Sequence, residues 1–157
     1  MVPEQRLNPN LEAYDMEGLT IGTICSHSAL QIFHGARQEG FPTIGITKED
    51  RREMYASFPL GRPDEFLVVE DFNDMLKPSF QRELIDRNVV LIPHGSMVEY
   101  VGSEAVAKHL EVPMFGNPKV LNWESDRSKE REFTMMTLGR QSSGVATVRV
   151  FCSRICR

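Results

Sequence analysis

The sequence predicts an α/β fold in which a mostly parallel sheet carries helices on both faces. Short apolar runs typical of strands alternate with segments of helical periodicity along the chain. Residues 19–47 form a strand–helix–strand unit, whose two strands should be parallel and joined by a right-handed crossover. The run Val89–Ile92 is fully apolar, as expected for a strand that is buried on both faces. A chain of 157 residues suits one domain, or a small domain and a fragment.

The first half of the chain is predicted to supply three strands and the first helices. Leu30, Phe33 and Ala36 recur at helical spacing, whereas the flanking runs alternate apolar residues with small or hydroxyl ones. Residues 48–64 are charged and interrupted by prolines and a glycine, so they are predicted to be mostly loop. The predicted elements are a short helix at 11–16, strands at 19–25, 41–47 and 65–69, and a helix from Ala29 to Gly40.

The second half continues the alternation. Pro78 suits the first turn of a helix, and Ser103 is a candidate helix cap because its oxygen can accept a free backbone N–H. The predicted elements are helices at 78–88, 104–110 and 119–133, strands at 89–92 and 112–115, and turns at 93–96 and 116–118. Cys25 is predicted to lie inside the first strand.

Polar and small residues follow three predicted strands, in the loops 26–28, 94–96 and 116–117. Ligands of open parallel sheets bind at the carboxyl ends of the strands. The serines of the first loop precede a helix, where backbone N–H groups favour an anion such as phosphate. His27 can donate to a phosphate or to a ring carbonyl, and Gly95 lets a ligand approach the backbone. The competing interpretation is that the serines only cap the helix.

Several other chemistries find no support in the sequence. The spacing of the histidines matches no zinc pattern; these residues are His27, His34, His94 and His109. The residues around Ser96 depart from the Gly-x-Ser-x-Gly elbow of serine hydrolases. No glycine-rich dinucleotide fingerprint follows the first strand, and no P-loop is present. We therefore predict no metal site and no catalytic residue in this chain.

Composition and charge exclude further classes of protein. Hydrophobic residues make up 41% of the chain and charged residues 25%, which excludes a disordered or collagen-like chain. There is no apolar run long enough for a membrane span, and no secretory signal. Three cysteines favour the reducing cytoplasm. The formal net charge is −4, and residues 1–128 alone carry −8, so no nucleic-acid partner is expected.

Four strings in the chain resemble the archaeal PurP family, whose members are 5-formaminoimidazole-4-carboxamide ribonucleotide (FAICAR) synthetases. The strings are CSHSALQIFHGARQEGF from Cys25, IPHGS from Ile92, VPMFGN from Val112 and WESDR from Trp123. The resemblance runs from about Leu19 to Arg131. It implies a role in purine biosynthesis, in which ATP and formate are used to formylate the amine of aminoimidazole carboxamide ribonucleotide (AICAR). It also implies a Rossmann-like pre-ATP-grasp domain.

The resemblance implies that His27 and Ser96 contact AICAR, with Ser26, Ser28 and Gly95 as further candidates. Members of the family continue into an ATP-grasp domain that binds ATP and Mg²⁺, and nothing in this chain resembles that domain. We therefore expect ATP and Mg²⁺ to be cofactors of the full-length family and not to be bound by this chain. The isolated chain is expected to be inactive as a formate–AICAR ligase.

We predict a pre-ATP-grasp domain at 1–133 and a tail without family resemblance at 134–157. The tail has no acidic residue and holds four arginines and two of the three cysteines. One interpretation is out-of-frame translation of a truncated gene; the alternative is a genuine tail with a strand at 145–151. Three functions remain open: a truncated enzyme, a stand-alone ribonucleotide-binding module and half of a split synthetase. An apolar face predicts a homo-oligomer or a separate ATP-grasp chain as partner; its candidates are Phe115, Trp123 and Phe133.

Overall fold

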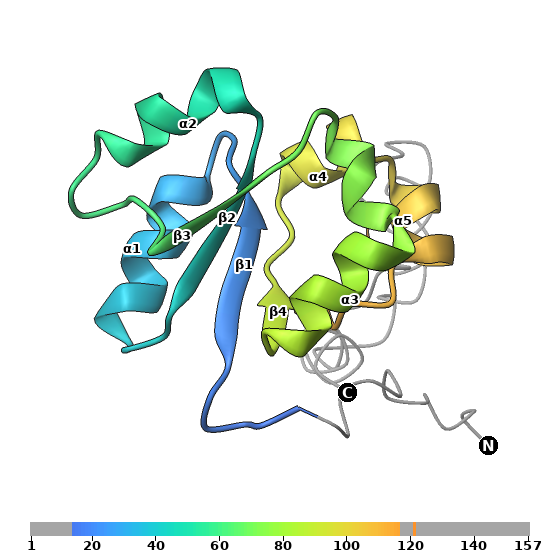
Figure 1. Cartoon of the computed structure of the whole chain (residues 1–157), viewed down its shortest axis with the longest axis horizontal. Helices are drawn as coiled ribbons and strands as arrows, with labels where there is room; N and C mark the ends of the chain where they lie inside the picture. The colour runs from blue at the N-terminus through green and yellow to red at the C-terminus, as the bar shows by residue number, and fades with distance from the viewer. Residues whose placement is uncertain (1–13, 117–120, 122–157) are drawn as a thin grey trace, which may run out of the picture. The chain divides into compact units, whose positions relative to one another are not determined.

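The central element is a sheet of four parallel strands, in the order β3-β2-β1-β4 (Figure 1). The structure is a computed structural model that describes residues 14–116 and 121. The strands are β1 (Thr20–Ile24), β2 (Thr43–Thr47), β3 (Glu65–Val68) and β4 (Val89–Leu91). Gly22 of β1 lies opposite Ile44 on one side and Leu91 on the other. The predicted α/β class with a parallel sheet is confirmed.

Helices cover both faces of the sheet, as predicted (Figure 1). The chain steps from β1 to β2 to β3 in one direction and then returns to place β4 on the far side of β1. Because each crossover is right-handed, this reversal moves the connecting helices to the opposite face. The helices of the described part are α1 (Ala29–Gln38), α2 (Glu49–Ala56), α3 (Pro78–Asp86), α4 (Gly95–Tyr100) and α5 (Ser103–His109), with a 3₁₀ helix, η2, at Phe72–Leu76.

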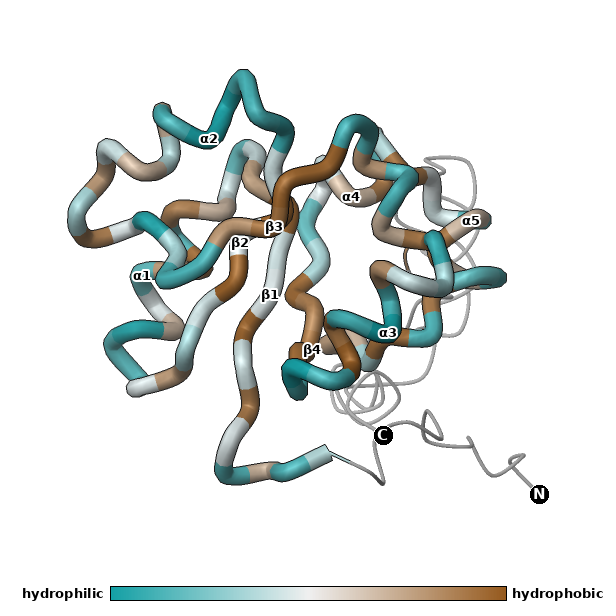
Figure 2. Tube along the Cα trace, viewed as in Figure 1, coloured by the Kyte–Doolittle hydropathy of each residue, from teal (hydrophilic) through white to brown (hydrophobic). Residues whose placement is uncertain are grey.

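A hydrophobic core beneath α1 packs the residue that follows β1 against α1 and α2, which cover one face of the sheet. Its buried residues are Cys25, Ala29, Phe33 and Tyr55, with Leu30 and Phe66 packed against them. Gly45 of β2 permits this packing, since a Cβ there would lie 2.7 Å from both the Cys25 Sγ and the Pro63 Cγ. Figure 2 shows hydrophobic residues along β3 and β4 and hydrophilic residues over the first turn of α2.

The prediction that 48–64 is mostly loop was wrong, because α2 occupies its first half. Glu49 and Asp50 stand in the first turn of this helix, where negative charge complements the helix dipole. Tyr55 is the side chain that α2 buries. The prolines and the glycine that suggested a loop all follow the helix. A helix with so small an apolar face has almost no hydrophobic periodicity to reveal it.

The turn predicted at 93–96 was wrong in its second half, where α4 begins at Gly95. Ser103 was also not the cap of the next helix, because α5 already includes it and Gly102 occupies the N-cap position. Gly102 has a φ of +87°, a left-handed conformation that favours glycine. It thus ends one short helix and starts the next.

The strand predicted at 112–115 is reduced to a single parallel bridge between Leu91 and Met114. Leu91 N–H donates to the Pro113 carbonyl at 2.9 Å, and Phe115 N–H donates to the Leu91 carbonyl at 2.8 Å. Pro113 has no N–H to extend the ladder, which explains why the pairing stays short.

The helix predicted at 11–16 is absent from its described part, because residues 14–16 are not helical. The Tyr14 hydroxyl instead donates to the Val89 carbonyl at 2.9 Å, and the side chain of Asn88 bonds to both backbone groups of Asp15. Apart from residue 121, the helix predicted at 119–133 lies outside the described residues. The tail at 134–157 also lies outside them.

Asp64 joins the start of β3 to β2 and makes folding sensitive to acid. Its carboxylate accepts bonds from the Thr43 N–H at 2.9 Å and the Thr43 hydroxyl at 2.7 Å, and pairs with Arg37 at 3.1 Å. Burial alone would raise the pKa of Asp64, but these bonds outweigh it and lower the pKa below its ordinary value. The stabilisation is therefore present above the unfolded pKa of about 3.9 and is lost as pH falls through the folded value.

We expect Asp64→Asn to lower the free energy of unfolding by about 1 kcal/mol near neutral pH, because the half-exposed carboxylate is partly screened by solvent. The gap between variant and wild type should close as the pH is lowered toward about 2. Urea unfolding of both proteins across this pH range measures it. A gap that does not change with pH would contradict the ionic character of the contact.

Candidate functional site

The predicted loops meet where the strand order reverses. β1 and β4 are neighbours in the sheet, but the chain leaves β1 toward one edge and β4 toward the other. In open parallel sheets, such a switch point opens a crevice at the carboxyl ends of the two strands, and ligands bind there. The loop 26–28 follows β1, and residues 92–94 lead from β4 into α4, whose first turn holds Gly95 and Ser96. All five predicted ligand-binding residues therefore lie in the two segments that flank this switch point.

His94 ties these two loops together. Its Nε2 lies 3.0 Å from the carbonyl oxygen of Ile24, the last residue of β1. Its Nδ1 accepts a bond from the Ser96 N–H at 3.3 Å. An N–H can only donate, so Nδ1 carries no proton and Nε2 donates to Ile24. The imidazole thus bridges the two strand ends and sets the position of Ser96 relative to the β1 loop.

The predicted residues differ in how far they are exposed. His27 and Gly95 are exposed, Ser28 is partly buried, and Ser26 and Ser96 are buried with 7% and 6% of their surface accessible. Ser28 occupies the N-cap position of α1, but its side chain makes no capping hydrogen bond. The alternative that this serine only caps the helix is therefore not realised, and its hydroxyl is not committed to the helix end.

A second group of side chains, which sequence reasoning missed, reaches the same edge of the sheet. The Tyr100 side chain at the end of α4 interacts with Arg51 and, more weakly, with Ser26, and both lower the pKa of its hydroxyl. The same interaction with Tyr100 raises the pKa of Arg51. The ring of Phe72 stacks on that of Tyr100, with centroids 5.1 Å apart and planes at 24°.

We call Lys48, Arg51, Phe72 and Tyr100 the cation–aromatic cluster. The Arg51 guanidinium carbon lies 5.6 Å from the Tyr100 ring centroid and 6.0 Å from that of Phe72. The Lys48 ammonium lies 5.4 Å from the Phe72 ring centroid. Both cations are within the range in which an aromatic face attracts a positive charge. The cluster joins residues that follow β2, β3 and β4.

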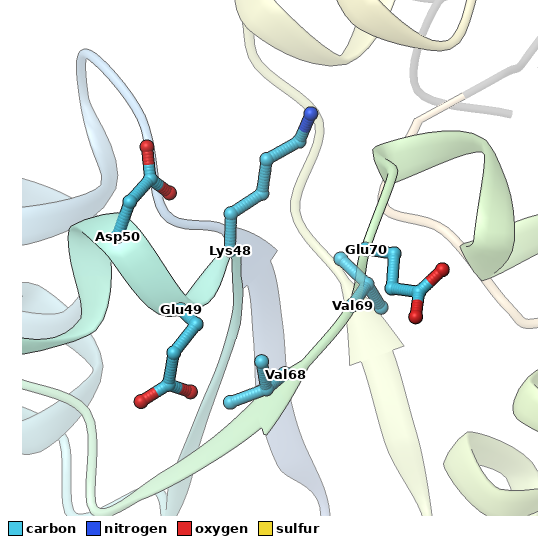
Figure 3. A pocket seen from close by; sticks show the side chains of 6 residues that line it. All are labelled: Lys48, Glu49, Asp50, Val68, Val69 and Glu70. Atoms are coloured by element: carbon cyan, nitrogen blue, oxygen red, sulfur yellow. The ribbon is translucent and has the colours of Figure 1, made fainter.

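A hollow of about 490 Å³ lies beside this cluster, at the carboxyl ends of β2 and β3 (Figure 3). Its lining residues are Lys48, Glu49, Asp50, Val68, Val69 and Glu70. None of the predicted ligand-binding residues lines it. Figure 3 shows the carboxylates of Glu49, Asp50 and Glu70 pointing in different directions, so they do not converge on a common point.

The described residues offer little for metal or thiol chemistry. In 14–116 and 121, no group of three or more His, Cys, Asp or Glu side chains is placed to hold a metal ion. Cys25 follows β1 directly and is fully buried, and burial raises the pKa of its thiol to about 12. Such a thiol is not a nucleophile near neutral pH. Within the same residues, no helix is both long and apolar enough to span a bilayer.

Comparison with known proteins places the chain in a family. Residues 21–151 match a family described as a protein of unknown function, DUF1246. The chain belongs to the DUF1246 family. The match extends into residues 134–151, which the sequence analysis set apart; the boundary at residue 133 stays a prediction.

Curated relatives of this DUF1246 chain carry the name 5-formaminoimidazole-4-carboxamide-1-β-D-ribofuranosyl 5′-monophosphate synthetase. The protein from Korarchaeum cryptofilum is 46% identical over 153 residues, which cover 98% of this chain and 40% of the relative. That from Methanococcoides burtonii is 50% identical over 133 residues, which cover 85% of this chain and 37% of the relative. The chain thus spans about 40% of the length of these relatives. The predicted resemblance to the FAICAR synthetases is confirmed.

Solved structures agree with the fold of the DUF1246 chain. The IMP biosynthesis protein PurP from Thermococcus kodakaraensis matches 69% of this chain with a TM-score of 0.55 and 33% identity, over 33% of its own length. A pyruvate carboxylase from Rhizobium etli matches 75% of this chain with a TM-score of 0.53, over 12% of its own length. At 12% identity, the carboxylase indicates a shared fold alone.

Proposed function

We propose that this chain binds AICAR in the crevice between the loops after β1 and β4, as part of purine (IMP) biosynthesis. One observation carries the proposal: both loops that the family resemblance singles out flank the switch point of the sheet, and His94 bridges them. A ligand in this crevice contacts residues that are far apart in the sequence but close in the fold. The name of the relatives supplies the ligand class, a ribonucleoside 5′-monophosphate.

Each proposed contact has a distinct chemical part. His27 is exposed and donates from its imidazole to a phosphate oxygen or to the carboxamide carbonyl. Ser96 and Ser26 are buried hydroxyls that both donate and accept, which suits the ribose and the polar edge of the base. The Ser28 hydroxyl is not used as a helix cap. Gly95 adds no side chain, and a Cβ there would meet open space.

The resemblance implies that AICAR is formylated on its amine at the expense of ATP, with formate as the one-carbon donor. Transfer of a phosphoryl group requires metal ions and fixed cations around the phosphates. The described residues contain no group of three or more His, Cys, Asp or Glu side chains that could hold Mg²⁺. We therefore assign no step of phosphoryl transfer to them. Their proposed role is to bind AICAR and to present its amine.

A split synthetase is the second candidate function, because the chain spans about 40% of its curated relatives. In that case a separate ATP-grasp chain completes the site. Phe115 is 70% exposed at the end of the bridged segment, which supports a covered face in an assembly. A second copy of this chain is the other proposed partner. Size-exclusion chromatography of the chain alone distinguishes self-association from dependence on a second protein.

A stand-alone binding module is the third candidate function, and it differs from the other two because it needs no partner. The number of cysteines supports the cytoplasm as the compartment of the protein.

We expect calorimetry to detect binding of AICAR to the 157-residue chain, and His27→Ala to weaken it roughly tenfold to a hundredfold. That range corresponds to the loss of one hydrogen bond to a charged group. His109→Ala is the matched control, because His109 is an exposed histidine in the last turn of α5. The proposal would be contradicted if millimolar AICAR gave no heat of binding and did not raise the unfolding temperature of the chain. Equal effects of the two variants on AICAR affinity would also contradict it.

A further inference from the structure

We propose that Arg51 binds the phosphate of the ribonucleotide, an inference that rests on the proposed function and extends it to a residue outside the family strings. The site would take a phosphate monoester dianion. Its ligands are the Arg51 guanidinium and the Tyr100 hydroxyl. The proposal rests on the position, the partners and the charge of Arg51.

The position of Arg51 follows from contacts across the carboxyl edge of the sheet. Arg51 lies in the first turn of α2, after β2, and reaches Tyr100 at the end of α4, after β4. Tyr100 is the last residue of α4, the helix that begins with Gly95 and Ser96. The Arg51 guanidinium carbon lies 5.6 Å from the centroid of the Tyr100 ring. Arg51 therefore lies beside a residue of the same short helix as Ser96, one of the proposed AICAR contacts.

The charge of Arg51 is not neutralised within the described part of the chain. No described carboxylate lies within 4.0 Å of its guanidinium, the limit for an ion pair. Its neighbours behave differently: Lys48 pairs with Asp71 at 3.3 Å, and Arg52 pairs with Glu49 at 3.8 Å. Asp71 is further occupied by bonds from Asn73. Lys48 is thus balanced, whereas Arg51 keeps its full positive charge.

The surroundings of Arg51 suit an anion that needs several donors. A guanidinium presents a planar fork of N–H groups that matches phosphate oxygens, and Tyr100 uses only part of that fork. The stacked rings of Phe72 and Tyr100 hold the guanidinium without cancelling its charge. Holding it before the ligand arrives reduces the entropy lost on binding. The carboxylate of Asp50, the neighbouring acid, is exposed and screened by water.

The test compares AICAR with its nucleoside, which lacks the phosphate, by calorimetry on the full 157-residue chain. Wild type should bind the nucleotide more tightly than the nucleoside. Arg51→Gln should reduce that preference about tenfold or more, and Arg51→Lys, which keeps the charge but loses the fork, should fall in between. Arg52→Gln is the matched control, since it removes the same charge from the same helix. Thermal unfolding confirms that each variant is folded.

The outcomes separate this inference from the proposed function. If Arg51 only supports the fold of α4, Arg51→Gln weakens nucleotide and nucleoside equally, and the inference is overturned. The same conclusion follows if Arg52→Gln reduces the preference as much. Tyr100→Phe keeps the ring and removes the hydroxyl, so it should lower the preference less than Arg51→Gln. Failure of wild type to bind either ligand instead contradicts the proposed function.

Discussion

Replacing Phe33 by alanine should lower the free energy of unfolding by about 3–5 kcal/mol, the cost of deleting a buried aromatic ring. Phe33 is fully buried in the cluster that contains Cys25, Ala29 and Tyr55. A domain of this size is stable by only about 5–15 kcal/mol, so the variant should be close to unfolding at room temperature. Urea unfolding followed by far-ultraviolet circular dichroism measures the change.

The matched control is Phe58→Ala, which removes the same side chain from a site where it is 45% exposed. Its expected cost is below about 1 kcal/mol. Equal costs for the two variants would show that the ring of Phe33 does not carry the core beneath α1. The effect also reaches the site, because Cys25 in this cluster directly precedes Ser26. A folded remnant of Phe33→Ala should therefore bind AICAR less well than wild type.

The sheet was predictable because its strands carry strong local signals. The apolar run that begins at Val89 indicates a strand buried on both faces, and the periodicity of Leu30 and Phe33 indicates the helix that connects β1 to β2. The order of these elements, together with right-handed crossovers, brings the loops after β1 and β4 to one edge. For the same reason, the positions of His27 and Ser96 at that edge could be inferred without coordinates.

Other features have no local signal. α2 buries little more than Tyr55, so its charged sequence shows no periodicity that would distinguish it from a loop. The strand predicted at 112–115 has the right composition, but Pro113 limits its pairing to one bridge. The Arg51 guanidinium lies over the Tyr100 ring although the two residues are distant in the sequence. Such a pair depends on the packing of α2 and α4 against different strands, which hydropathy does not encode.

His94 shows that a residue of a type suited to ligand binding can instead have a structural role. In the sequence it belongs to the same string as Ser96 and is as good a candidate ligand as His27. In the fold both of its ring nitrogens are engaged, one by Ile24 and the other by Ser96. Its imidazole therefore holds the end of β1 and the start of α4 together, whereas His27 remains exposed. Residue type alone cannot separate these two roles.

The 157-residue chain should form no detectable FAICAR from AICAR, formate and ATP when it is assayed alone. Making formyl phosphate requires a site that neutralises the charge of the ATP phosphates. The family resemblance implies that this site belongs to an ATP-grasp domain, and the chain spans only about 40% of the length of the relatives that carry the synthetase name. Liquid chromatography of the reaction mixture with an authentic FAICAR standard measures the product.

Two controls give this result its meaning. The same preparation must bind AICAR by calorimetry, which shows that lack of turnover is not lack of folding. The full-length relative from Korarchaeum cryptofilum, 46% identical to this chain over the shared region, serves as the active reference. Product formation by the chain alone that requires ATP and formate and is lost in His27→Ala would contradict the prediction. It would place the phosphoryl-transfer site within these 157 residues. Turnover that appears only when a separate ATP-grasp chain is added would instead identify half of a split synthetase, because each chain would then supply one side of the site.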